Sequence, residues 1–78
     1  MIDEIYFLKE EKQDAETIIK RMLKLKEDLE KKRETTLKRS NNVAGYDEKI
    51  KLCNMRIIKQ NAKIAYITNI LKFIESNK

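Results

Sequence analysis

Acidic side chains recur at helical spacing in the first half of the chain. Glu27, Glu30 and Glu34 are separated by three and four residues, so a helix would place them on one face. Carboxylates in this arrangement hold Mg²⁺ in some all-helical enzymes, but such sites need a second acidic pair on a facing helix. The segment 49–74 contains no Asp or Glu. We therefore expect a solvated face that forms ion pairs with lysines four positions away.

Other catalytic and metal-ligating side chains are scarce. The 78 residues include no His, which removes the usual general base near neutral pH. A single cysteine, Cys53, cannot assemble a zinc or iron–sulfur site, and it falls at a position typical of a buried thiol that fills a core. Ser40 and Ser76 have no base at suitable spacing. The sequence predicts no catalytic residue, no metal and no cofactor, and hence no enzyme.

Basic side chains give a stronger signal. Residues 1–34 contain nine basic and ten acidic groups, whereas residues 35–78 contain nine basic and three acidic groups. Such an excess could bind the phosphates of DNA or RNA, although cations near a helix end also stabilise its dipole and keep a surface soluble. The residues that would carry nucleic-acid binding are Lys31, Lys32, Arg33, Lys38 and Arg39, supported by Lys59 and Lys63 from a second stripe that also includes Lys49 and Arg56.

Two long helices must position these groups, because Pro is absent and Gly occurs once, at Gly45. Apolar residues on both sides of it recur in alternating steps of three and four, which is the pattern of a coiled-coil seam. The seam positions are Leu8, Ala15, Ile18, Met22, Leu25 and Leu29, then Tyr46, Ile50, Cys53, Ile57, Ile64, Ile67, Leu71 and Ile74. Glu11, Lys32 and Gln60 interrupt the pattern.

The break between the helices predicts an antiparallel hairpin. We expect one domain over residues 1–78, with a helix over about 3–38, a turn over about 39–45 and a helix over about 46–75. Ser and Asn compete for backbone hydrogen bonds, and Gly45 tolerates left-handed geometry. One continuous helix in a parallel coiled coil is the main competitor, since a single Gly costs about 1 kcal/mol. In the hairpin, Leu29 would face Cys53, and Arg21 would lie unfavourably beside Lys63.

The second helix carries another apolar stripe beyond its seam. This stripe comprises Leu52, Met55, Ile58, Ala62, Tyr66, Ile70 and Phe73. A helix that is apolar on two faces must be covered on both, and the first helix can cover only one. We expect a homodimer that forms a four-helix bundle, or another protein partner, with Leu52, Met55, Ile58, Tyr66, Ile70 and Phe73 as the binding residues. Tyr6, Phe7 and Phe73 are expected to close the core at the open end of the hairpin.

These features favour an all-α, non-enzymatic interaction or regulatory protein, such as an inhibitor or adaptor. Abundant Lys, Ile and Asn are typical of an AT-rich genome, which fits a low-GC bacterium or its phage. The lone Cys and the acidic N-terminal segment fit a reducing cytoplasm. A basic dimer that contacts nucleic-acid phosphates is the alternative function. Membrane contact is less favoured, because the second helix is apolar around too much of its circumference for one interfacial face.

Overall fold

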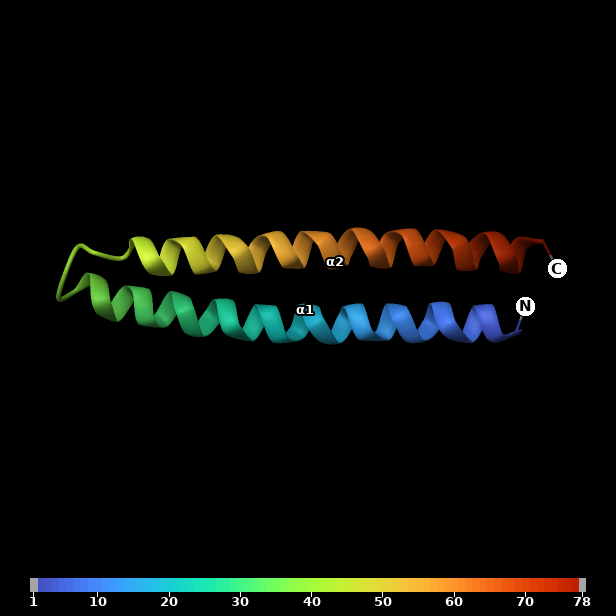
Figure 1. Cartoon of the computed structure of the whole chain (residues 1–78), viewed down its shortest axis with the longest axis horizontal. Coiled ribbons are helices and arrows are strands. Elements are labelled where there is room, and N and C mark those ends of the chain that lie inside the picture. Colours follow the sequence, from blue (N-terminus) through green and yellow to red (C-terminus); the bar gives the residue numbers. More distant parts are fainter. Residues whose placement is uncertain (1, 78) are drawn as a thin grey trace.

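The chain folds as a helical hairpin (Figure 1). The computed structural model describes residues 2–77 and contains two helices, α1 (Ile2–Leu37) and α2 (Ala44–Ser76), which pack against each other along their length. Residues 1 and 78 of the expected domain lie outside the described part. The all-α hairpin is confirmed, and one continuous helix is excluded.

The turn is shorter than the sequence predicted and lies earlier. The amides of Arg39 and Ser40 both donate to the carbonyl of Thr36, at 2.9 and 2.8 Å, which closes the end of α1. The Oγ of Ser40 then accepts a hydrogen bond from the amide of Asn42, at 3.2 Å. Side-chain competition of this kind ends a helix. Ser40 and the asparagines therefore make the break, as their chemistry predicted.

Gly45 does not take part in this turn. It belongs to the first turn of α2, and no described glycine has a positive φ. The expected left-handed role of Gly45 is wrong. Val43 precedes α2 as its N-cap, without a side-chain hydrogen bond, and is itself buried. Burial of this apolar residue, together with the preceding turn, fixes where α2 begins.

The predicted seam forms the core. The buried apolar residues include five seam positions of the sequence pattern, two before the turn and three after it, and none of the large described side chains is fully enclosed. The buried set is Ala15, Leu29, Val43, Cys53, Ile67 and Leu71. Leu25, another seam position, keeps 44% of its surface exposed. The core is one layer of side chains between two helices, which leaves most seam residues partly exposed.

Two ion pairs join the helices across the seam. Near the turn, Arg33 of α1 bonds Asp47 in the first turn of α2, where the helix dipole also favours an acid. Nearer the open end, the Nζ of Lys63 lies 2.7 Å from a carboxylate oxygen of Glu11. The sequence pattern had placed Lys63 beside Arg21 instead. Glu11 interrupts the apolar seam, so its carboxylate is within reach of a cation on α2.

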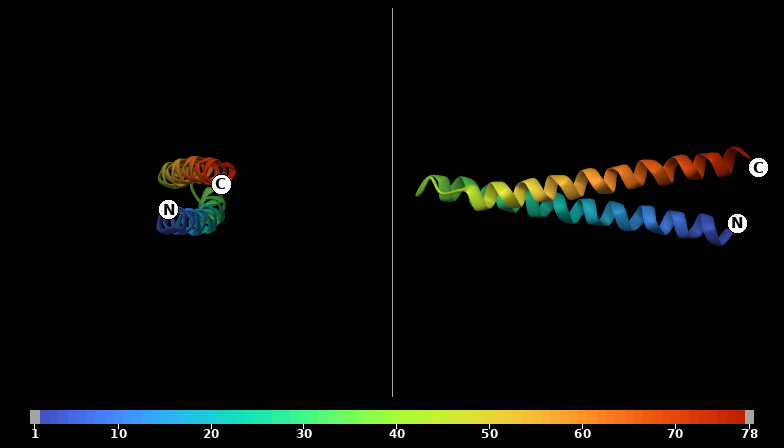
Figure 2. Two further views of the ribbon diagram at one scale, coloured as in Figure 1. Left: turned by 90° about the vertical axis from the view of Figure 1, so that its right-hand side faces the viewer. Right: turned by 45° about the horizontal axis from the view of Figure 1, so that its top comes forward.

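The hairpin is a thin rod that measures 61 × 14 × 13 Å. Figure 2 shows the helices inclined to each other, with the turn at one end and both termini at the other. Its radius of gyration is 17.8 Å, whereas a compact chain of this length has about 12 Å. Neither described helix has an apolar stretch long enough to cross a membrane.

Candidate functional site

The face of α2 that points away from α1 is strongly apolar and uncovered in the single chain. We call it the apolar stripe: Leu52, Met55, Ile58, Ala62, Tyr66, Ile70 and Phe73. Its five largest exposed members are between 50% and 70% exposed, and Ile70 is half-buried. At 100° per residue the stripe lies about 150° around the helix from the seam. The sequence pattern therefore located a real surface feature, with all its large side chains on one side of α2.

The aromatic residues at the open end do not form the expected core. Tyr6, Phe7 and Phe73 remain 69%, 58% and 70% exposed. The hairpin is only one layer thick there, so no third element covers these rings. Phe7 instead lines a shallow apolar groove with Leu8 and Ile74. Phe73 is thus an exposed member of the apolar stripe.

A second groove lies between the helices nearer the turn. Its apolar lining comes from Leu25 and Leu29 of α1 and from Leu52 and Cys53 of α2. Cations line its rim, namely Lys32, Lys49 and Arg56. Cys53 is 4% exposed, which agrees with a thiol that fills the core. We call this feature the leucine groove. The sequence did not predict this groove, because it depends on how the side chains of two helices pack at the edge of the seam.

Of the basic residues expected to bind phosphates, Lys31, Lys32, Arg33, Lys38 and Arg39 lie near the turn, whereas Lys59 and Lys63 lie farther along α2. Several of the seven are already paired. Lys31 pairs with Glu27 at 3.2 Å, Arg33 with Asp47, and Lys63 with Glu11. Lys38 and Arg39 are exposed beyond the end of α1. Ion pairing lowers the positive potential of this cluster. Its exposed cations without an ion pair among the described residues are Lys32, Lys38, Arg39 and Lys59.

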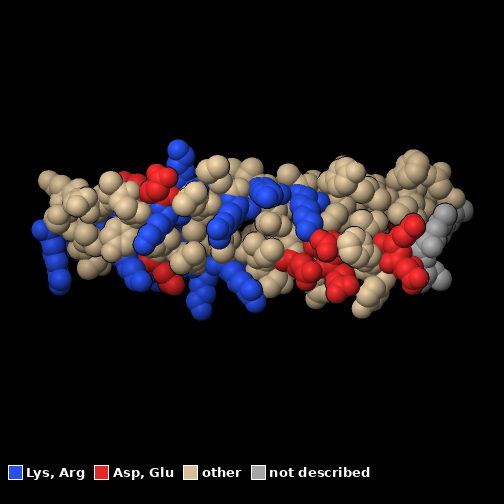
Figure 3. All heavy atoms as spheres, viewed as in Figure 1, with Lys and Arg blue, Asp and Glu red and all other residues tan. Residues whose placement is uncertain are grey.

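Charge is separated along the rod. The open half, residues 2–16 with 62–77, contains four Lys against seven Asp and Glu, a net charge of −3. The turn half, residues 17–61, contains thirteen Lys and Arg against six Asp and Glu, a net charge of +7. Figure 3 shows carboxylates gathered over the open end and cations over the middle and the turn. The fold creates this polarity by bringing the acidic N-terminal segment alongside the C-terminal half of α2.

Comparison with known proteins gives no lead. No protein-family model, curated protein or solved structure matches this chain. Its function is therefore inferred from the surfaces described above.

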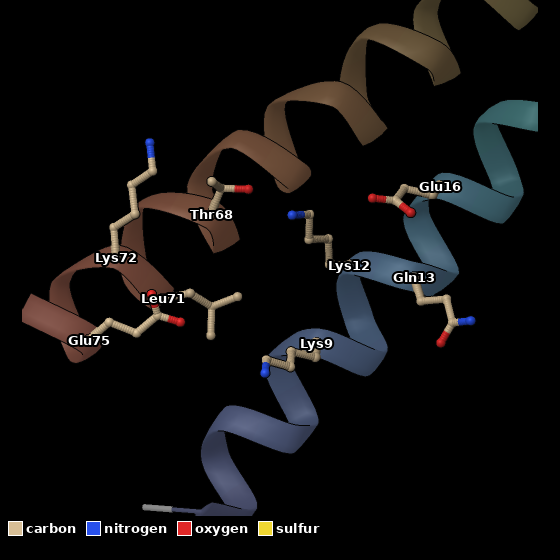
Figure 4. A pocket seen from close by; sticks show the side chains of 8 residues that line it. All are labelled: Lys9, Lys12, Gln13, Glu16, Thr68, Leu71, Lys72 and Glu75. Carbon is tan, nitrogen blue, oxygen red and sulfur yellow. The ribbon is translucent and has the colours of Figure 1, made fainter.

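Another groove lies near the open end (Figure 4). Its side chains diverge: Lys12 points across toward α2, whereas Gln13 and Lys72 point away from the space. Among its lining residues only Leu71 is buried. A small-molecule site needs an apolar pocket in which a few polar groups converge. This groove has mixed charges and no such convergence.

The glutamates of α1 behave as a solvated face. Glu27 forms the expected pair with Lys31, and Glu30 lies 3.9 Å from Lys26. The expected partner of Glu34 was Lys38, but α1 ends at Leu37, so Lys38 leaves the helical face. Among residues 2–77, no group of three or more potential ligands is placed to hold a metal ion.

Proposed function

We propose that this protein is a non-enzymatic interaction module that acts through the apolar stripe of α2. One observation carries this proposal: five large apolar side chains lie exposed along one side of α2, outside its seam with α1. Exposed apolar patches of this size mark surfaces that bind other proteins. Pairing of two hairpins through their α2 helices, which gives an assembly of four helices, would cover them. A small regulator in a reducing cytoplasm, such as a phage-encoded inhibitor or adaptor, would use such a surface.

The accessible surface of the hairpin supports a need for a partner. The chain exposes 6514 Å², whereas a compact monomer of 9.3 kDa exposes about 5,000 Å². The excess is about 1,500 Å², and a typical stable interface hides about 800 Å² of each partner. A domain this small also rarely reaches ordinary stability from its own core. Association would therefore supply burial that the isolated hairpin lacks.

Substitution within the stripe tests this function. Ile58→Asp or Tyr66→Asp places a charge in the middle of the stripe, so we expect loss of self-association or partner binding. Sedimentation equilibrium gives the mass, and circular dichroism gives the helix content. Lys72→Asp is the matched control, because it adds an acid to an exposed position of α2 outside the stripe. The proposal is wrong if the stripe variants keep the wild-type mass and all wild-type binding.

Nucleic-acid binding is the second candidate function. The observation that favours it is the net charge of +7 on the turn half, with Lys38 and Arg39 exposed at its end. A cationic end of this kind attracts a phosphate backbone without reading its sequence. This function depends on charge at the turn, whereas the first depends on the apolar stripe, so substitutions separate them.

A further inference from the structure

The apolar stripe has a nearly palindromic spacing. Positions at nearly equal distances before and after residue 62 both carry large apolar side chains. Two antiparallel copies of α2 would thus bring together Leu52 with Phe73, Met55 with Ile70, Ile58 with Tyr66, and Ala62 with its own counterpart. A two-fold interface requires this reciprocity, since each contact occurs twice. Most binding surfaces for an unrelated protein need no such symmetry.

The centre of the stripe is suited to a two-fold axis. Ala62 is exposed there, with Ile58 and Tyr66 at 68% and 69% exposure on either side. A small residue at the centre lets two helix backbones approach, while larger side chains fill the space on both sides. The centre of the stripe also lies close to the middle of α2 (Ala44–Ser76), so antiparallel pairing would overlap nearly the whole helix.

Charge selects the antiparallel direction. Parallel copies would place the two turn halves, each of net charge +7, side by side. Antiparallel copies would place each turn half beside an open half of net charge −3. Like charges in contact weaken association, and opposite charges favour and orient it. The α2 stripe has no acid of its own, so the acidic segment of α1 supplies the complementary charge at each end.

We propose that a second copy of this chain covers the apolar stripe, antiparallel, about a two-fold axis at Ala62. This inference rests on the proposed function and adds the partner and its orientation. The stripe lies about 150° from the seam, whereas neighbours in a closed four-helix bundle lie about 90° apart. The four helices therefore form one layer, with the two α2 helices inside and the two α1 helices outside. This order explains why α2 is apolar on two faces and α1 mainly on one.

The leucine groove gives the dimer a socket. Phe73 of the second copy lies level with Leu52, whose side chain lines that groove together with Leu25 and Leu29. Phe73 is 70% exposed in the single chain, and Leu25 is 44% exposed. Insertion of the ring would cover both. The five largest exposed stripe residues contribute roughly 600 Å² per copy, taking about 200 Å² for a large apolar side chain, which approaches the standard interface.

Lysine cross-linking of the native protein tests the orientation. Equal amounts of unlabelled and ¹⁵N-labelled protein are mixed, treated with an amine-reactive cross-linker, digested and analysed by mass spectrometry. Lys51 and Lys72 are exposed on α2 and lie about 30 Å apart along one helix. A cross-linker that is too short to span this distance cannot join them within one chain. Reflection about Ala62 brings Lys51 of one copy level with Lys72 of the other. We expect a mixed-isotope product that joins Lys51 to Lys72.

Each outcome separates this inference from the proposed function. Mixed Lys51–Lys51 and Lys72–Lys72 products would show a parallel pair and overturn the inference, while the interaction function would stand. If the native protein is a monomer and Ile58→Asp abolishes binding of a different protein, the inference is again overturned and the interaction function stands. If Ile58→Asp changes neither the mass nor the binding of the protein, both the inference and the proposed function are wrong.

A substitution tests the socket. Phe73→Ala removes the ring, so we expect the dimer dissociation constant to rise at least tenfold in sedimentation equilibrium. Phe7→Ala is the matched control, because Phe7 is an exposed aromatic residue of α1 outside the stripe. Equal effects of the two substitutions would show that Phe73 has no specific socket.

Discussion

At the scale of single residues, two polar side chains interrupt the seam with different consequences. Glu11 is compensated by Lys63, but their side chains are 32% and 43% exposed, so the pair contributes little to stability. Gln60 is different. Its Oε1 atom is buried and has no hydrogen-bond partner among the described residues. An unsatisfied buried polar atom costs about 1–3 kcal/mol. Gln60 is therefore a destabilising position of the core.

Gln60→Met tests this view of the seam. Met has a similar length and no unsatisfied oxygen, so we expect the free energy of unfolding to rise by about 1 kcal/mol in urea titrations followed by circular dichroism. Gln13→Met, at an exposed position of α1, should change it by less than about 0.5 kcal/mol. If Gln60→Met lowers stability or yields several assembled species, Gln60 instead fixes the pairing register, as polar seam residues do in some coiled coils.

At the scale of the elements, the helices differ in how many faces they must bury. α1 buries mainly its seam, whereas α2 buries its seam against α1 and exposes a second apolar stripe. The limits of α2 are set by the turn, not by its glycine. Gly45 lies inside the helix, and a Cβ added there would meet no heavy atom within 4 Å. Its backbone freedom therefore only destabilises the helical state.

Gly45→Ala should stabilise the hairpin. Ala lowers the entropy of the unfolded chain and has the higher helix propensity, so we expect the free energy of unfolding to rise by about 0.5–1 kcal/mol. Ala44→Gly, the matched exchange at the adjacent position, should lower it by a similar amount. Urea denaturation of both variants gives the comparison. Destabilisation by Gly45→Ala would mean that this position needs a conformation open only to glycine.

At the scale of the whole molecule, the rod has a basic turn half and an acidic open half. This polarity arises because the hairpin brings residues 2–16 alongside the C-terminal half of α2. In the proposed dimer it would orient two antiparallel copies, and it also leaves a cationic end exposed at Lys38 and Arg39. This cationic end alone could give the protein affinity for nucleic acid.

A salt titration against random-sequence duplex DNA separates these uses of charge. We expect binding only at low salt, because three of the basic residues that would contact phosphates, Lys31, Arg33 and Lys63, already pair with carboxylates. Charge reversal at Lys38 and Arg39 should abolish that binding and leave the dimer mass unchanged. Binding that persists near physiological salt and disappears on this reversal would instead support the nucleic-acid function.

The sequence by itself determined the helices, the hairpin and the two apolar faces of α2. These features depend on local propensity and on periodic spacing, and both are visible without coordinates. The seam pattern correctly placed Ala15, Leu29, Cys53, Ile67 and Leu71 in the core. The break at Ser40 followed from side-chain competition for backbone hydrogen bonds.

Only the tertiary structure decided how surfaces from distant segments combine. Spacing along one helix could not show that Tyr6 and Phe7 lack cover, that Lys63 reaches Glu11, or that the leucine groove opens beside Leu52. Each of these depends on the relative placement of α1 and α2. The charge polarity of the rod also depends on the fold. Residues 2–16, with six acids and two Lys, lie alongside residues 62–77, which add only two Lys and one Glu, so their negative charge is not cancelled.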